Sequence, residues 1–345
     1  MSYWMPPSRE RLYFPYKIAA LAKLLLEDGV PLAATLCGTG LDAGMLDSLS
    51  CLTSIEQYLL VCRNAIRLSS DGSLPFRAGA RLHLSDHGMV GLLLLSCESV
   101  HDYFRLAVKY QLLATPTLAI EGAEDAGDAL WIFPDEASPE LPEDLRRFLV
   151  EQQVVQQVTH LQNVLGTVCP PSLVCFAHPA PPHRALYRDY LGCPCVFDWH
   201  RSEIRYPREI LAQRPYLANP LAATMLQSTC DGLVADMEAS LGFAGKVYRT
   251  LRHMHDPGVG MKAVASVMKM TDRTLRRRLA DEGTSFSTIS HQVKYRVATQ
   301  HLTRSEVSVE QIAAIAGFSD PANFRRAFIR WTSMTPAQFR RLQHR

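Results

Sequence analysis

The sequence predicts an α+β N-terminal domain followed by an all-α C-terminal domain that contains a repeated two-helix unit. Length, charge distribution and an internal repeat lead to this prediction. At 345 residues the chain exceeds one ordinary hydrophobic core, so we expect more than one domain. Residues 246–345 carry 18 Lys and Arg against 7 Asp and Glu, a net charge of +11. Residues 1–245 hold the other 18 basic and 27 acidic side chains, a net charge of −9, together with all nine cysteines.

The N-terminal part alternates helical and strand-like patterns. Ile18, Leu21, Leu24 and Leu25 form one apolar stripe within residues 12–30, where Gly29 and Pro31 act as stop signals. Further helices are predicted over residues 54–68, 99–113 and 142–166, and strands over 117–120, 129–133, 173–178 and 195–199. We therefore predict an α+β domain over residues 1–216, a helical connector over 217–245 and a separate C-terminal domain over 246–345.

Two stretches of the C-terminal part match each other. They are GMKAVASVMKMTDRTLRRRLADEG (260–283) and SVEQIAAIAGFSDPANFRRAFIRW (308–331). Leu275 and Leu279 of the first correspond to Phe324 and Phe328 of the second. The offset is 48 residues up to the helix caps and 49 after them, so the second copy contains one inserted residue. A fixed offset of this kind indicates a duplicated structural unit.

Helix start and stop signals occur at the same places in both copies. Thr271 is a suitable N-cap in the first copy, and Ser319 or Asp320 in the second. Pro321 falls in the first turn of a helix, where its missing N–H costs nothing. Gly317 follows the preceding helix, where a left-handed residue is favoured. Each copy therefore predicts a short helix, a tight turn and a second helix, which is the helix-turn-helix pattern.

The second helix of each copy has a basic outer face. With Leu275 and Leu279 inward, the first copy exposes Arg273, Arg276 and Arg277. The second copy likewise exposes four polar residues, which are Asn323, Arg325, Arg326 and Arg330. Such helices enter the DNA major groove, where arginine recognises guanine and asparagine recognises adenine. One basic helix could equally be a solvated surface, but two matching basic helices favour double-stranded DNA as the partner.

The segment between the copies predicts a spacer helix over residues 284–302, capped by Thr284 or Ser285. Its apolar residues recur at roughly helical spacing, at Phe286, Ile289, Val293, Val297 and Leu302. Two helix-turn-helix units held by such a linker helix would enter successive major grooves, roughly 34 Å apart.

The same residues resemble the C-terminal signature of the AraC/XylS family of bacterial transcription regulators, over about residues 246–342. Lys294 and Ser333 depart from the family pattern, which more often has arginine and glycine there. The resemblance implies an activator that contacts RNA polymerase, with base-facing positions at Arg273, Arg276, Arg277, Asn323 and Arg326. The phosphate-contacting or supporting positions that we predict are Lys262, Lys269, Thr271, Arg278, Ser319, Arg325 and Arg330.

Residues 74–113 and 171–211 resemble the effector domain of one branch of this family, the arabinose-binding or ornithine-regulator type. This resemblance implies a domain that binds a small-molecule effector and mediates homodimerisation. The sequence does not identify the effector residues. Six cations could each pair with an acidic effector or remain surface charges: Lys17, Arg77, Arg81, His101, Lys109 and Arg205.

Two alternatives have different chemistry. Cys193, Cys195 and the histidines His178, His183 and His200 could form a metal- or redox-sensing site, although C-x-C is not the usual zinc spacing. An enzyme with an accessory DNA-binding tail would need a catalytic motif, and we find neither a phosphate-binding loop nor a G-x-S-x-G or H-E-x-x-H motif. We therefore expect no catalytic residues, cofactor or metal. Without a signal peptide or a long apolar run, we expect a cytoplasmic protein without a membrane partner.

Overall fold

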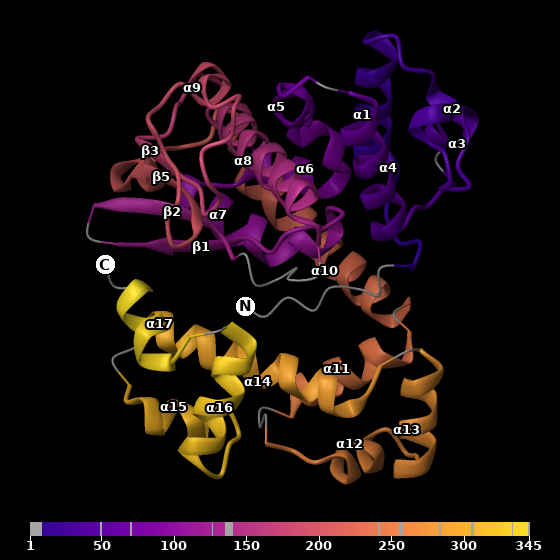
Figure 1. The fold of residues 1–345 in the computed structure, drawn as a ribbon, viewed down its shortest axis with the longest axis vertical. Coiled ribbons are helices and arrows are strands. Elements are labelled where there is room, and N and C mark those ends of the chain that lie inside the picture. The colour runs from indigo at the N-terminus through magenta and orange to yellow at the C-terminus, as the bar shows by residue number, and fades with distance from the viewer. Residues whose placement is uncertain are drawn as a thin grey trace. The chain divides into compact units, whose positions relative to one another are not determined.

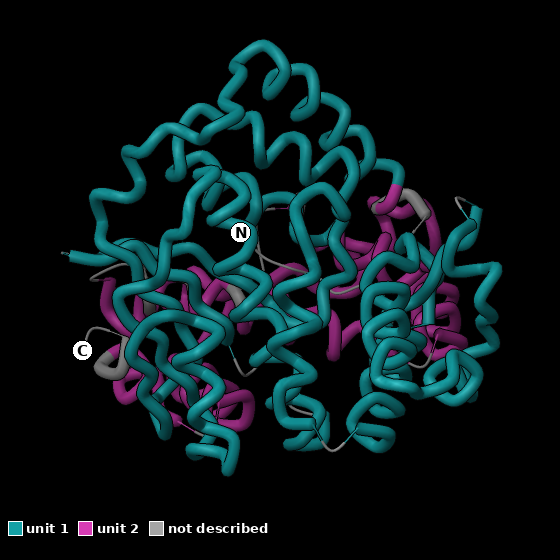
Figure 2. The backbone as a smooth tube through the Cα atoms, turned by 90° about the horizontal axis from the view of Figure 1, so that it is seen from above, with its two compact units in different colours: residues 1, 8–236 teal, residues 2–7, 237–345 magenta. Residues whose placement is uncertain are grey.

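The computed structural model describes residues 9–48, 50–69, 71–125, 127–134, 141–240, 242–254, 258–282, 284–304, 307–332 and 334–343. The chain forms two compact units, one within residues 8–236 and one within residues 237–345 (Figure 2). The first unit combines helices with a sheet, whereas the described part of the second unit is helical. The predicted α+β and all-α classes are thus confirmed.

The first unit is mainly helical (Figure 1). Its helices are α1 (Tyr16–Glu27), α2 (Leu32–Thr35), α3 (Ala43–Leu46), α4 (Ile55–Leu68), α5 (Leu74–Ala80), η1 (Leu84–His87), α6 (Gly88–Ser96), α7 (Val100–Tyr110), η2 (Gln111–Leu113), α8 (Glu143–Leu165), α9 (Ala185–Leu191), η4 (Arg208–Ala212) and α10 (Pro220–Ser240). The helices predicted within 12–30 and over 54–68, 99–113 and 142–166 correspond to α1, α4, α7 with η2, and α8. Ser54 and Gln57 start α4 with a capping box, and Gly166 ends α8 at a φ of 69°.

Helix α8 runs through the middle of the first unit. It packs against α4, α5, α6 and α9, and most of its residues are buried on all sides. Polar side chains are among them, so their hydrogen bonds must come from neighbouring elements. Tyr58 of α4 donates a hydrogen bond to Oε1 of Gln152 (2.6 Å), and Tyr103 of α7 donates one to Oε1 of Gln157 (3.3 Å).

The sheet has the order β1-β2-β5-β3-β4. Its strands are β1 (Glu121–Glu124), β2 (Asp128–Phe133), β3 (Leu173–Cys175), β4 (Cys195–Val196) and β5 (Ser202–Pro207). All neighbouring pairs are antiparallel except β3 and β4, which are parallel. Trp131 of β2 is fully buried and stacks on Phe104 of α7, with ring centroids 4.1 Å apart. The aromatic pair joins the sheet to the helices of the same core.

Two sequence predictions of strands were inaccurate. Residues 117–120 are irregular, and the strand begins at Glu121 instead. The side-chain amide of Gln111 bonds both backbone groups of Ile120, at 3.0 Å to the N–H and 2.8 Å to the carbonyl, so a sheet partner cannot use them. The strands predicted over 173–178 and 195–199 are shorter than expected, at three and two residues. The central strand β5 was not predicted, because charged Glu203 and Arg205 interrupt its apolar alternation.

The second unit contains α11 (Phe243–His253), α12 (Met261–Val267), α13 (Asp272–Asp281), α14 (Phe286–Arg304), α15 (Val309–Ile315), α16 (Pro321–Thr332) and α17 (Pro336–Gln343). They form two hydrophobic cores. Ile289 and Val293 of α14 belong to the core with α11–α13, and Ala298 and Leu302 belong to the core with α15–α17. Helix α14 therefore joins the two cores, as the spacer prediction required (Figure 1). No helix in the described ranges is long and apolar enough to cross a bilayer.

Candidate nucleic-acid interface

The first helix-turn-helix unit consists of α12 and α13. Thr271 caps α13, because its hydroxyl oxygen accepts a hydrogen bond from the backbone N–H of Thr274 at 3.2 Å. The predicted cap is therefore confirmed. The turn before it contains Lys269 at a φ of 53°, in the left-handed region that glycine favours. Lys269 is exposed, so its side chain extends from the turn into solvent.

The second helix-turn-helix unit consists of α15 and α16, and its turn has glycine where the first helix-turn-helix unit has lysine. Gly317 has a φ of 75°, which confirms the predicted left-handed residue. Asp320 caps α16, since its carboxylate accepts hydrogen bonds from the N–H groups of Ala322 (2.9 Å) and Asn323 (3.3 Å). Of the two predicted cap candidates, Asp320 has this role. Ser319 is exposed and is the extra residue that shifts the repeat offset from 48 to 49.

Helix α13 presents a row of exposed guanidinium groups. Arg273, Arg276 and Arg277 are exposed, and none of them bonds to another described residue. Leu275 and Leu279 are fully buried on the opposite side. The predicted inward and outward faces of this helix are thus observed. Arg273, Arg276 and Arg277 are available to a partner without the loss of an internal contact.

Helix α16 has a similar exposed face, but two of its arginines already have partners. Arg325 forms an ion pair with Glu310 of α15 (2.7 Å), and Arg326 donates a hydrogen bond to the side-chain oxygen of Asn323 (2.6 Å). Arg330 is exposed near the end of the helix. Arg326 and Asn323 therefore lie next to each other on the exposed face, and a DNA base would have to compete with their mutual hydrogen bond.

Two side chains that the sequence analysis did not single out as structural anchors hold these helices in position. The carboxylate of Glu282 accepts hydrogen bonds from the N–H groups of Phe243 (2.5 Å) and Ala244 (2.8 Å), and so caps α11. Lys294 of α14 donates to the carbonyl of Gly317 at 2.7 Å, and its ammonium lies 4.6 Å from the ring centroid of Phe318. Lys294, a departure from the family pattern, thus fixes the turn of the second helix-turn-helix unit to the spacer helix.

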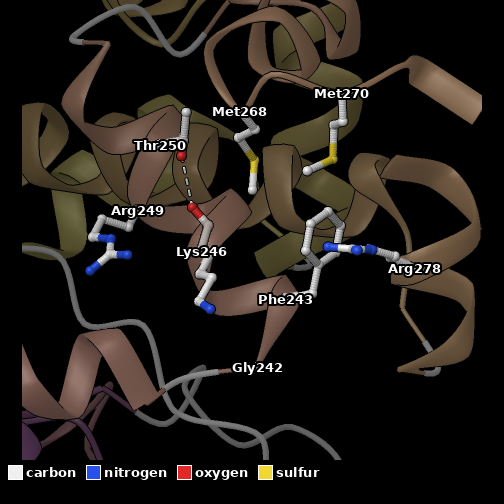
Figure 3. A pocket seen from close by; sticks show the side chains of 8 residues that line it. All are labelled: Gly242, Phe243, Lys246, Arg249, Thr250, Met268, Met270 and Arg278. Carbon is white, nitrogen blue, oxygen red and sulfur yellow. Dashed lines mark hydrogen bonds between the residues drawn. The ribbon is translucent and has the colours of Figure 1, made fainter. Parts of the chain in front are cut away.

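An open pocket of about 410 Å³ lies between α11 and the turn that joins α12 to α13. Figure 3 shows its lining residues, which are Gly242, Phe243, Lys246, Arg249, Thr250, Met268, Met270 and Arg278. The guanidinium of Arg278 lies over the ring of Phe243, 5.3 Å from its centroid. Arg278 therefore supports the packing of α11 against α13. The remaining predicted position, Lys262 of α12, is exposed, like Lys269.

The comparisons with known proteins agree with this architecture. Residues 29–215 match the family described as the arabinose-binding domain of AraC transcription regulators, N-terminal, and residues 264–342 match a helix-turn-helix domain family. The first match alone covers more than half of the 345 residues.

Relatives and a solved structure extend over almost the whole chain. The chain is 28% identical to the ornithine utilization regulator of Pseudomonas aeruginosa over 324 residues, 93% of this chain and 94% of that protein. It is 27% identical to an uncharacterized HTH-type transcriptional regulator of Mycobacterium tuberculosis, over 98% of each chain. The crystal structure of the transcriptional regulator CdpR from Pseudomonas aeruginosa has the same fold, with a TM-score of 0.51 at 21% identity, covering 96% of this chain and all of that one. With both family models matched in this order along one chain, the protein belongs to the AraC family of transcription regulators with an arabinose-binding type of N-terminal domain.

Proposed function

We propose that this regulator is a transcription activator that binds DNA through α13 and α16 and responds to a small-molecule effector. In this proposal residues 1–216 bind the effector, residues 217–245 connect the domains and residues 246–345 bind DNA. Base contacts come from Arg273, Arg276 and Arg277 in the first helix-turn-helix unit and from Asn323 and Arg326 in the second helix-turn-helix unit. Phosphate contacts or support come from Lys262, Lys269, Thr271, Arg278, Ser319, Arg325 and Arg330.

The observation that carries the DNA-binding part is the pair of basic helices on a shared spacer. Helix α14 has 19 residues, which at about 1.5 Å per residue corresponds to about 28 Å. This length is close to the roughly 34 Å between successive major grooves on one face of DNA. This length supports the proposal that the two helix-turn-helix units occupy a site of about two helical turns.

The two helix-turn-helix units should contribute unequally to recognition of the DNA sequence. The guanidinium groups of Arg273, Arg276 and Arg277 have no internal partners among the described residues. Arg326, by contrast, must exchange its hydrogen bond with Asn323 for one with a base. The exchange offsets part of the gain from the base contact. We therefore expect Arg276→Ala to lose more specific affinity than Arg326→Ala, with the loss at Arg276 about 1–3 kcal/mol.

The experiment is selection of a preferred sequence from random duplex DNA by the full-length protein, followed by affinity measurements over a range of salt concentrations. Arg276→Ala should weaken the selected site and relax the base preference at one position. Lys262→Ala should weaken all sequences alike and reduce the salt dependence by about one phosphate contact. Arg188→Ala serves as the control, because it removes the same charge from an exposed position of α9, outside residues 237–345. Failure to select any sequence over random competitor would contradict the proposal.

Control by a metabolite is supported by the family of the N-terminal domain and by the relative that is named for ornithine utilization. We further propose that the protein acts in the cytoplasm as a homodimer, contacts RNA polymerase and has no enzymatic activity. Leu221, Met225 and Leu233 of α10 are exposed and supply apolar surface for self-association. Sedimentation of a Met225→Glu variant tests this surface: a shift from dimer to monomer supports it, and an unchanged dimer contradicts it.

A metal- or redox-sensing regulator is the second candidate. The thiols of Cys193 and Cys195 interact, which lowers the pKa of Cys193 and raises that of Cys195. Over the described ranges, however, no three metal-ligating side chains gather in one place. A Cys193→Ser/Cys195→Ser double variant separates the two candidates. Loss of the transcriptional response to oxidant or zinc would favour the sensor, and an unchanged response would exclude these thiols.

A further inference from the structure

Of the six cations considered as effector ligands, only one lacks an acidic partner among the residues that the structure describes. Five have carboxylates beside them: Arg77 with Asp28, Arg81 with Glu27, His101 with Glu124, Lys109 with Asp231, and Arg205 with Glu203. Lys17 of α1 is the exception, because no carboxylate of the described residues lies within 4.0 Å of its ammonium. Lys17 is nevertheless buried, with only 4% of its surface exposed. A buried ammonium without a counter-charge is costly, so its presence requires an explanation.

The surroundings of Lys17 supply little compensation. Its ammonium donates one hydrogen bond to the carbonyl of Thr115 (3.1 Å) and lies 5.8 Å from the ring centroid of Tyr58. Burial lowers the pKa of Lys17 from 10.5 to about 8. Besides Tyr58, the titratable groups that interact with Lys17 are Cys62 of α4, His87 of η1 and His160 of α8, and none of them is a carboxylate. At least two of the three ammonium hydrogens thus remain for another acceptor.

Unpaired acceptors lie on α8 near Lys17, whose charge adds to burial in lowering the pKa of His160. Gln156 of α8 contacts Nε2 of His87 at 3.4 Å through its amide nitrogen, but its Oε1 has no partner among the described residues. His160 lies edge-on to His87, with ring centroids 4.9 Å apart, and its Nε2 is also unpartnered. The other nitrogen of His160 bonds the backbone of Leu82, which supports protonation there and leaves Nε2 as an acceptor. Both Gln156 and His160 are more than nine-tenths buried.

The backbone beside Lys17 is strained. Thr115 is buried and has a φ of 50°, in the left-handed region that β-branched residues rarely adopt. Two side chains of α1 hold this segment: Tyr16 donates to the carbonyl of Ala114 (2.9 Å), and Lys17 donates to the carbonyl of Thr115. Strained residues persist where the surrounding structure holds them, and they concentrate at ligand sites.

We propose that Lys17, Gln156 and His160 form the effector site, and that its ligand is a small carboxylic acid with a neighbouring hydrogen-bond donor, such as a 2-hydroxy or 2-amino acid. The carboxylate supplies the counter-charge that Lys17 lacks. The ammonium of a 2-amino acid supplies donors for both Oε1 of Gln156 and Nε2 of His160, whereas the single O–H of a 2-hydroxy acid supplies one for Oε1 of Gln156. A purely anionic ligand would leave these two acceptors unpaired, and a neutral ligand would leave the lysine uncompensated. The inference rests on the proposed effector control and names its chemistry.

The test is calorimetric titration of the full-length protein at pH 7 with four compounds that differ in one group. L-Lactate and L-alanine have both the carboxylate and the donor, acetate has the carboxylate alone, and L-lactamide lacks the charge. We expect L-lactate or L-alanine to bind about ten-fold more tightly than acetate and L-lactamide. Larger effectors with the same end group would bind more tightly still, so these fragments report on the end group itself.

The variants assign each preference to a residue. Lys17→Met should abolish the preference for L-lactate over L-lactamide, and Gln156→Leu should abolish the preference for L-lactate over acetate. Lys23→Met changes an exposed lysine of the same helix and should leave both preferences intact. Because Lys17→Met removes a destabilising charge, the variant should fold, and loss of binding then reports on the ligand contact itself.

The outcomes separate this inference from the proposed function. If no compound shows saturable binding at millimolar concentration, or if the variants keep the wild-type preferences, the buried acceptors hold ordered water only and the inference is wrong. DNA selection with the same protein preparation tests the regulator separately. Selective DNA binding without a carboxylate preference would overturn only the effector site, whereas the reverse result would overturn only the DNA-binding proposal.

Discussion

Replacing Lys17 by methionine should stabilise the ligand-free protein, although it removes a hydrogen bond. Burial lowers the pKa of Lys17 from 10.5 to about 8. At about 1.4 kcal/mol for each pH unit between these two values, the penalty for the buried charge is about 3–4 kcal/mol. Methionine has a similar shape and no charge, but it leaves the Thr115 carbonyl without its donor, at a cost of about 1 kcal/mol. The expected gain at pH 7 is therefore about 2–3 kcal/mol.

The stability that Lys17→Met adds should decrease as the pH rises, because the pKa of Lys17 is lowered in the folded protein. The folded-state pKa of Lys17 lies below the unfolded-state value, so the unfolded chain binds the proton more tightly. The penalty is present in full below about pH 8 and disappears as the pH rises toward 10.5. Between pH 7 and about pH 9.5, about 2 kcal/mol of the difference between Lys17→Met and the wild type should be lost.

The assay is denaturant unfolding of the full-length proteins at both pH values. Tryptophan fluorescence reports on the first unit through Trp131, which is fully buried in the same core as the helices around Lys17. Trp331 of α16 reports on the second unit, which the substitution should leave unchanged. Lys23→Met is the control and should show no comparable gain, because Lys23 is exposed. A Lys17→Met variant less stable than the wild type at pH 7 would refute the reasoning. An equal gain at both pH values would show that packing, and not charge, is the cause.

Three further predictions concern the second unit, each measured as the free energy of unfolding of the full-length variant. Lys269→Gly should stabilise it by about 1 kcal/mol and Gly317→Ala should destabilise it by at least as much, because both positions have a left-handed φ; the same sign for both would contradict this. Lys294→Met should cost about 1–2 kcal/mol through the lost hydrogen bond to Gly317 and the contact with Phe318, and a neutral effect would count against an anchoring role. Glu282→Ala should cost about 1–2 kcal/mol by uncapping α11, with Glu282→Gln in between; equal losses in the two variants would argue against capping.

Local signals in the sequence were sufficient for most of the second unit. The positions of Thr271, Gly317 and Pro321 predicted where helices end and begin, because capping depends on residues three or four apart. The apolar spacing of Leu275 and Leu279 predicted which side of α13 is exposed, since a helical face repeats every three to four residues. The charge difference between the two parts of the chain could be found by counting charged residues in the sequence.

The first unit depends on contacts between distant residues, and there the sequence was insufficient. Residues 117–120 have a strand-like composition, but Gln111 takes the hydrogen bonds that a strand would need, and β5 was recognisable only beside β2 and β3. The proposed effector site likewise combines residues that are distant in the sequence, Lys17 of α1 with Gln156 and His160 of α8.

By itself, the amino-acid sequence determined the class of the protein, the duplicated basic helices and their exposed faces, because each depends on spacing within a few turns of chain. Only the tertiary structure distinguished Lys17 from five other cations that look equivalent in the sequence. Those five face carboxylates, whereas Lys17 bonds a carbonyl 98 residues away and has no counter-charge among the described residues. The solvation and the charge partner of a side chain are set by residues distant in the chain, so no local pattern encodes them.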